Sequence, residues 1–353
     1  MSDLFTATTA AQVEEALSRG EDVEEERGEL VNRMTPLTLA CQRGELEVVD
    51  CLLNHGADPN HCPPDSSSPT QVAAQEGHAA ILERLVRAGV DINDNQGGRD
   101  TALIIASRQG HVDVVDCLLS LGADTEIKGQ LEMTALMAAS EHGRIDVVDR
   151  LLAAGANVNA VSRSKTSALM KTALGGHVSI IDRLIIHGAD VNHCNMVHFT
   201  PLMWAAQNGH AEAVDRFLSL GCDVNAQAAH GKTALILATQ RKKIDVVRLL
   251  LDHGADPLVQ DKEGRKAIDF TEASPEIQTL LNGLILLSFH HHQMRVDLFA
   301  KLTKEGAITT IIEKSISPRK NERPSRSHAL QKTAQSPNSF RFVLEILFSL
   351  FFT

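Results

Sequence analysis

The sequence predicts an all-α solenoid, in which about eight to nine short helix-turn-helix units with hairpin loops stack side by side. Internal repetition is the main observation, because seven related segments follow one another at intervals of 33 residues without insertion or deletion. Composition agrees with it: with 11 Phe, one Trp and no Tyr, the core must consist of small aliphatic residues that suit closely packed helices. The seven segments begin at Thr35, Ser68, Thr101, Thr134, Ser167, Thr200 and Thr233.

The first half of each unit predicts a short helix. Its Thr or Ser is a candidate N-cap, and the Pro or Ala that follows is a favoured first helical residue, as in Thr200 and Pro201. A glycine such as Gly209 closes this segment in six of the seven units, and Lys242 replaces it in the last. We therefore expect a helix of about two turns that ends at this glycine.

The second half of each unit predicts another helix, followed by a loop. Pairs such as Val147-Val148 and Leu151-Leu152 are spaced to form one apolar helix face. Gly155 and its equivalents then mark the helix C-terminus, and an Asp-Val-Asn-like stretch favours a turn. A unit of this size cannot bury its own apolar face, whereas stacked neighbours bury one continuous core.

These residues resemble the ankyrin repeat pattern T-P-L-x-x-A…G…V-V-x-x-L-L…G-A-D-V-N. The resemblance covers residues 1–283, with a shortened unit near residue 2 and a degenerate one at Lys266. It implies a solenoid whose inner helices and hairpin tips form a concave surface for a partner protein. The chain departs from the pattern in lacking the His of T-P-L-H, and most units lack the loop glycine that Gly231 and Gly264 retain.

The period ends near residue 283, and three further segments are expected. Residues 284–314 form an apolar, helical extension, 315–339 a disordered linker rich in Ser, Pro and basic residues, and 340–353 a short apolar terminus. That terminus is too short to span a bilayer. The alternatives are a membrane-surface helix over 340–352, a partner-binding helix, or a splice-variant tail, and the last two are favoured over membrane contact.

Charge and cysteine content limit the classes of partner and compartment. Residues 1–283 carry 40 acidic and 24 basic residues, which makes this part a poor electrostatic match for nucleic acid and favours a protein partner. Six cysteines fit no disulfide framework, and no signal segment opens the chain. We expect a monomer in the cytoplasm, with the nucleus as a second location.

No pattern of enzymatic residues or metal ligands is present, so we predict neither catalytic residues, nor a cofactor, nor a metal. The sequence lacks GxSxG, a phosphate-binding GxxxxGK[ST], HExxH and CxxC. His78, His111, His177 and His210 occupy equivalent places in their units, which favours a structural role. The Asn-His-Cys triplets at 60–62 and 192–194 lie four repeats apart, too far to share an ion.

Variation laid over the repeat predicts the partner-binding surface. The third residue after the unit's Thr is expected on the outward face of the inner helix, and five successive units place an apolar residue there. Packing between adjacent inner helices is the alternative explanation. The predicted partner-binding residues are Ile104, Met133, Met137, Met170, Met196, Phe199, Met203, Trp204 and Ile236.

Two further features remain. An acidic stripe on the second helices is expected to be a solvated surface, or less readily a docking site for a basic partner; it comprises Asp50, Glu83, Asp116, Asp149, Asp182 and Asp215. Family resemblance also implies asparaginyl hydroxylation at hairpin asparagines eight residues after a Leu, unless they only brace the hairpin. The candidates are Asn60, Asn93, Asn159 and Asn192.

The predicted function is that of a non-catalytic scaffold or adaptor that binds a protein on its concave face. One alternative is a substrate receptor or regulatory subunit of a larger complex such as a ubiquitin ligase, which would need a recognisable box motif after the repeats. A second is a membrane-associated scaffold that uses residues 340–352.

Overall fold

The computed structural model describes residues 3–28, 33–63, 66–95, 97–271 and 274–282. The chain divides into two compact parts, and the described residues belong to the first of them, Met1–Leu284. The segments 284–314, 315–339 and 340–353 predicted above lie outside the described residues. None of the described helices is long and apolar enough to cross a membrane.

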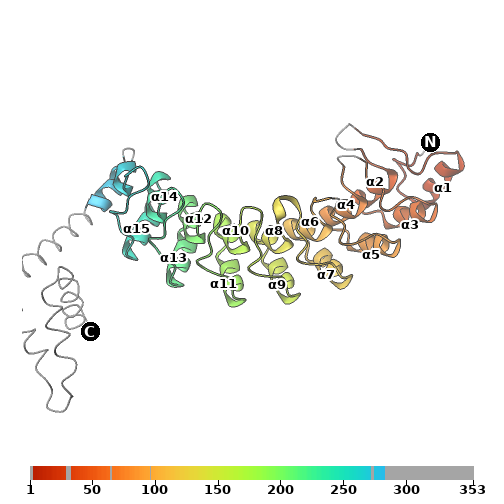
Figure 1. The fold of residues 1–353 in the computed structure, drawn as a ribbon. Coiled ribbons are helices and arrows are strands. Elements are labelled where there is room, and N and C mark those ends of the chain that lie inside the picture. Colours follow the sequence, from red (N-terminus) through yellow and green to blue (C-terminus); the bar gives the residue numbers. More distant parts are fainter. Residues whose placement is uncertain (1–2, 29–32, 64–65, 96, 272–273, 283–353) are drawn as a thin grey trace, which may run out of the picture. The chain divides into compact units, whose positions relative to one another are not determined.

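Two rows of helices make up the repeat array (Figure 1). The inner row consists of α2 (Pro36–Arg43), α4 (Pro69–Glu76), α6 (Ala102–Gln109), α8 (Ala135–Glu141), α10 (Ala168–Gly175), α12 (Pro201–Asn208) and α14 (Ala234–Gln240). The outer row consists of α1 (Ala10–Ser18), α3 (Leu46–Asn54), α5 (Ala79–Arg87), α7 (Val112–Ser120), α9 (Ile145–Ala153), α11 (Val178–Ile186), α13 (Ala211–Ser219) and α15 (Ile244–Asp252). Each helix packs on its neighbours in the same row and, within a unit, on its partner in the other row.

The predicted helix ends are confirmed. In all seven full units the Thr or Ser hydroxyl accepts a hydrogen bond from the backbone N–H three residues later, as Thr35 does from Thr38 at 3.1 Å. The glycine after each outer helix is left-handed, with φ of 86° at Gly155. Local sequence therefore sets where each helix starts and stops.

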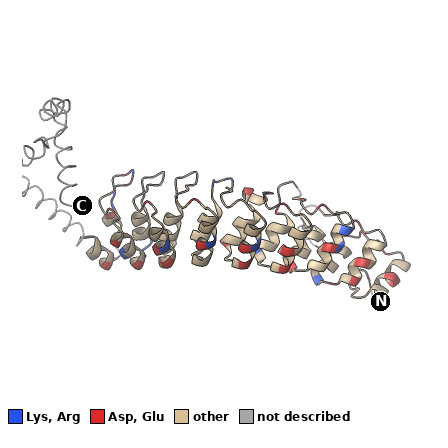
Figure 2. Ribbon diagram, turned by 90° about the horizontal axis from the view of Figure 1, so that it is seen from below, with Lys and Arg blue, Asp and Glu red and all other residues tan. Residues whose placement is uncertain are grey.

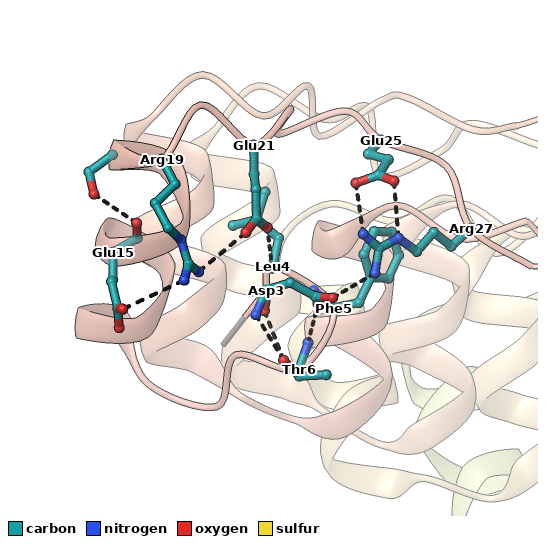
Figure 3. Close-up of polar contacts among 10 residues, drawn as sticks. Asp3, Leu4, Phe5, Thr6, Glu15, Arg19, Glu21, Glu25 and Arg27 are labelled. Carbon is teal, nitrogen blue, oxygen red and sulfur yellow. Dashed lines mark hydrogen bonds and ion pairs between the residues drawn. The ribbon is translucent and has the colours of Figure 1, made fainter. Parts of the chain in front are cut away.

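An ion-paired segment completes the N-terminal end of the array (Figure 3). Arg27 pairs with Asp3 at 2.8 Å, lowers the pKa of that carboxyl, and lies 4.4 Å from the centroid of the Phe5 ring. The backbone N–H of Leu4 donates to Glu21 at 2.8 Å. These contacts hold Leu4, which is buried, in the place that an inner helix occupies in the full units.

At the other end, a 3₁₀ turn takes the place of an inner helix. This turn, η2 (Ala267–Phe270), packs on α14, and residues 275–282 are helical. The degenerate eighth unit predicted at Lys266 is thus helical in its described part.

The hairpins keep a left-handed residue even where the loop glycine is missing. Lys165 and His198, which stand in place of that glycine, have φ of 58° and 57°. Backbone hydrogen bonds between successive hairpins hold this conformation, for example from Met196 to the Ser164 carbonyl at 3.1 Å. A short 3₁₀ turn, η1 (Gln130–Glu132), occupies the equivalent loop one unit before Lys165. Tertiary contacts therefore impose the turn that the sequence does not favour.

We predict that Lys165→Gly and His198→Gly raise the stability of the array. A left-handed conformation costs an L-residue about 1–2 kcal/mol, which glycine avoids at some cost in chain entropy, so a net gain of about 1 kcal/mol or less is expected. Thermal melting followed by circular dichroism measures this effect. Gly264→Ala, which changes a hairpin glycine with φ of 78° at a place where an added Cβ meets nothing within 4 Å, should lower the melting temperature as the matched reverse change. A lower melting temperature for both glycine variants would show that the strain is absent.

Candidate functional surface

The exposed face of the inner helices differs from the one that the sequence predicted. In every full unit from Thr101 to Thr233, four side chains of the inner helix are buried. They are the second, third, fifth and sixth residues after the Thr or Ser that starts the unit. The residues seven and eight places after it keep more solvent contact in all seven full units, and the fourth residue does so in four of them. At about 100° per residue these three places share one face. We call this the inner face, because the outer helices cover the opposite side.

The prediction of an exposed apolar stripe was wrong. Five of its members are at most 1% exposed, and Met133 is 8% exposed. Inner helices have neighbours on both sides as well as an outer helix behind them, so the buried arc extends to the third position. Ile104 illustrates this, because a Cβ added to Gly129 of the next hairpin would lie 2.9 Å from its Cδ1. The five residues are Ile104, Met137, Met170, Met203 and Ile236.

Phe199 and Trp204 remain accessible at the inner face. Both are half-buried, and their ring centroids lie 5.2 Å apart at an interplanar angle of 55°. Such a tilted contact is a favourable geometry for an aromatic pair. The indole Nε1 of Trp204 is buried and has no hydrogen-bond partner in the described part of the chain. The pair therefore presents ring surface rather than a polar group.

The adjoining hairpin tip carries two exposed apolar side chains. Met196 is 63% exposed and Val197 is 47% exposed. Both residues lie a few positions before Phe199, on the hairpin that leads into α12. This hairpin and α12 therefore carry four apolar residues that are exposed or half-buried. We call Met196, Val197, Phe199 and Trp204 the aromatic patch.

The repeated histidines are structural, as their equivalent places indicated. The Nε2 of each donates to a backbone carbonyl of the preceding unit, for example His111 to Gln75 at 2.8 Å and His210 to Leu174 at 2.9 Å. Each ring also lies over the glycine that ends the preceding inner helix. Within the ranges that the structure describes, no three His, Cys, Asp or Glu side chains are grouped to hold a metal ion.

Most of the acidic stripe forms ion pairs between units, which sequence reasoning missed. Asp149 pairs with Arg183 at 3.4 Å and Asp116 with Arg150 at 3.6 Å; Asp50–Arg84 and Asp182–Arg216 are paired in the same way. Red and blue segments accordingly recur together along the outer helices in Figure 2. The sequence signal that could have predicted these pairs is an Arg that follows each of these four acids by 34 residues. Exposed pairs of this kind contribute little individually, about 0–1 kcal/mol.

The candidate asparagines differ in how firmly they are held. Asn159 bridges to the next unit through both amide atoms at 3.0 Å, and Asn93 does so at 2.8 and 3.5 Å. Asn192 accepts one bond at 3.4 Å. No hydrogen bond joins the side-chain amide of Asn60 to another described residue, although the backbone N–H of Asn60 donates to the Asp58 carboxylate. Bracing of the hairpin is thus strong at Asn159 and weak at Asn192 and Asn60.

Comparisons with known proteins agree with the repeat pattern. The family description "Ankyrin repeats (3 copies)" matches residues 6–96, 70–162, 152–228 and 169–261. Among solved structures, the human ASB11 ankyrin repeat domain is similar, with 26% identity and a TM-score of 0.56. That similarity covers 61% of this chain and 96% of the ASB11 domain. A comparison with curated proteins gives no match. The chain belongs to the ankyrin repeat family.

Proposed function

We propose that this protein is a scaffold or adaptor that binds a partner protein through its inner face, with the aromatic patch at the centre of contact. Ankyrin repeats generally mediate protein–protein interaction, and their fold is typically a non-catalytic one. The observation that supports this particular surface is the patch itself. Exposed apolar residues that adjoin an aromatic pair on a folded protein usually mark a contact site.

Other exposed apolar residues lie apart from the aromatic patch. Ile186, at the end of outer helix α11, is 75% exposed but has no aromatic neighbour within its helix. Leu131 is 66% exposed on an earlier hairpin. Single exposed apolar residues are normal on protein surfaces. The aromatic patch differs because one hairpin and the helix after it carry two exposed apolar side chains together with two half-buried aromatic rings.

Site-specific photo-cross-linking tests this proposal. A photo-reactive residue placed at Val197 is expected to cross-link a partner protein in cells. The same residue at Ile186, an apolar position that is more exposed than Val197 but lies on an outer helix, is the control. Met196→Asp should abolish the cross-link from Val197 while the melting temperature stays unchanged, because Met196 is exposed. Equal cross-linking from Val197 and Ile186, or none from Val197, would refute the inner face as the contact surface.

We also propose that hairpin asparagines are hydroxylated, with Asn60 and Asn192 modified before Asn93 and Asn159. A modifying enzyme needs the hairpin to detach, so the cost of local unfolding should rank the sites. Mass spectrometry of protein co-expressed with an asparaginyl hydroxylase measures the gain of one oxygen at each site. Preferential modification of Asn159, which is the most firmly bonded, would contradict the ranking, and no oxygen at any site would refute the modification.

A further inference from the structure

We propose that the inner face around the aromatic patch binds an acidic, extended segment of its partner protein, with an apolar side chain of that segment packed on Phe199 and Trp204. This inference rests on the proposed function and adds the chemistry of the partner. It comes from the distribution of charge over the array rather than from the repeat pattern.

Basic residues predominate on the inner face and hairpin tips of the C-terminal units. From residue 163 onward, the exposed positions of this surface carry a single acid, Glu263. Arg265 pairs with Glu263 at 2.9 Å and also with Asp261, a buried acid of the same hairpin, at 2.8 Å. Glu132 and Glu141 of the preceding unit reach two of the basic groups. The basic residues at these positions are Arg163, Lys165, Lys171, Lys232, Arg241, Lys262 and Arg265.

Acidic residues of the same stretch lie elsewhere. They fall on the outer helices and on the loops that follow them, where Figure 2 shows red segments. These acids are Asp182, Asp190, Glu212, Asp215, Asp223, Asp245, Asp252 and Asp256. The exposed acids of this stretch are therefore scarce on the inner face and hairpin tips, whereas outer-helix arginines such as Arg183 and Arg216 are paired with acids. Such segregation selects a partner of opposite charge through the field of the whole surface.

The N-terminal units do not share this property. At the seventh and eighth places after the unit's Thr, they mix Arg43 and Arg108 with Glu76 and Glu141. A basic inner face is thus a feature of the units that surround the aromatic patch, and not a general consequence of the fold.

Several of these cations are available to a partner. In the described part of the chain, Lys165, Arg241 and Lys262 are exposed and make no ion pair. Lys171 pairs with Glu141 at 3.0 Å and Lys232 donates to the Gln240 side chain at 3.1 Å, so these two are already positioned. An apolar centre with a cationic rim results.

The size of this surface fits a short peptide segment. Adjacent helices lie about 10 Å apart, so three units span roughly 20–30 Å. An extended chain advances about 3.3 Å per residue, which gives about six to nine residues across the surface. We favour a peptide over nucleic acid because the surrounding outer helices and loops are acidic and would repel a phosphate backbone.

The probe is a pair of synthetic peptides with the same central Leu and Phe and with either Asp/Glu or Lys/Arg flanks. Trp204 is the single tryptophan and the chain has no tyrosine, so its emission reports directly on the aromatic patch. We expect the acidic peptide to shift this emission at a concentration at least about tenfold lower than the basic peptide, a difference that added salt should reduce.

Charge reversal on the full chain supplies the matched variants. The double variant Lys165→Glu with Lys232→Glu should weaken binding of the acidic peptide about tenfold or more. The control is Arg87→Glu with Arg248→Glu, which changes the net charge by the same amount as the first double variant. Both arginines are exposed on the outer helices α5 and α15, so the affinity for the acidic peptide should stay unchanged. Circular dichroism confirms that both double variants are folded.

Three outcomes would overturn the inference: equal binding of the two peptides, equal loss in both double variants, or tighter binding of a single-stranded oligonucleotide than of the acidic peptide. A shift of Trp204 emission with protein concentration alone would also overturn it, by identifying a second copy as the occupant. Cross-linking from Val197 with no preference for the acidic peptide would refute the partner chemistry and leave the proposed function standing. Absence of both results would refute both proposals.

Discussion

Leu151→Ala is expected to lower the free energy of unfolding of the repeat array by about 2–5 kcal/mol, the range for a buried Leu that leaves a cavity. Leu151 is fully buried on α9, between the outer helices α7 and α11. Since a solenoid is stabilised by each unit and by the contacts between neighbours, damage to a central unit also separates the flanking parts. We therefore expect the single unfolding transition to broaden or divide.

Urea unfolding followed by circular dichroism measures both effects. Ile186→Ala, on the exposed end of the next outer helix, is the control and should change the free energy by less than about 0.5 kcal/mol. A cost below about 1 kcal/mol for Leu151→Ala would show that the units do not share the continuous core described above.

Gly143→Ala is expected to destabilise the array more than Gly155→Ala, although both glycines belong to one unit and are left-handed, with φ of 70° and 86°. A Cβ at Gly143 would lie 2.7 Å from Cε1 of His177, whereas a Cβ at Gly155 meets nothing within 4 Å. The conformational cost of about 1–2 kcal/mol is common to both variants. Displacing the packed ring should add about 1–3 kcal/mol at Gly143 alone.

Chemical denaturation of the two variants provides the comparison. The double variant Gly143→Ala with His177→Ala should recover part of the difference, because the ring that the Cβ meets is then absent. Equal destabilisation by the two single variants would mean that backbone conformation alone explains the conserved spacing of these glycines within the chain.

One unit lacks this glycine, and Lys242 stands in its place with φ of 56°. The residue one unit after Lys243, where the other units have a His, Arg or Lys, is Glu276. Glu276 is exposed and pairs with Arg248 at 3.6 Å, so this unit has no counterpart of the packed His177 ring.

The repeat length, the helix boundaries and the all-α solenoid are all predictable from the order of the amino acids. These features depend on interactions within one unit: the hydroxyl of Thr35 caps its own helix, and Gly155 ends its own helix. The roles of the histidines were also predictable, because equivalent places in stacked units have equivalent neighbours.

Which side of the inner helix is exposed depends instead on how neighbouring units pack. Helical periodicity gives the angle between side chains but not the number of neighbours around a helix, and the inner helices pack on three sides. Met137, Met170 and Met203 are therefore core residues, while Trp204, one position after Met203, remains accessible. The left-handed Lys165 and the Asp149–Arg183 pair likewise depend on contacts between units, which no single unit encodes.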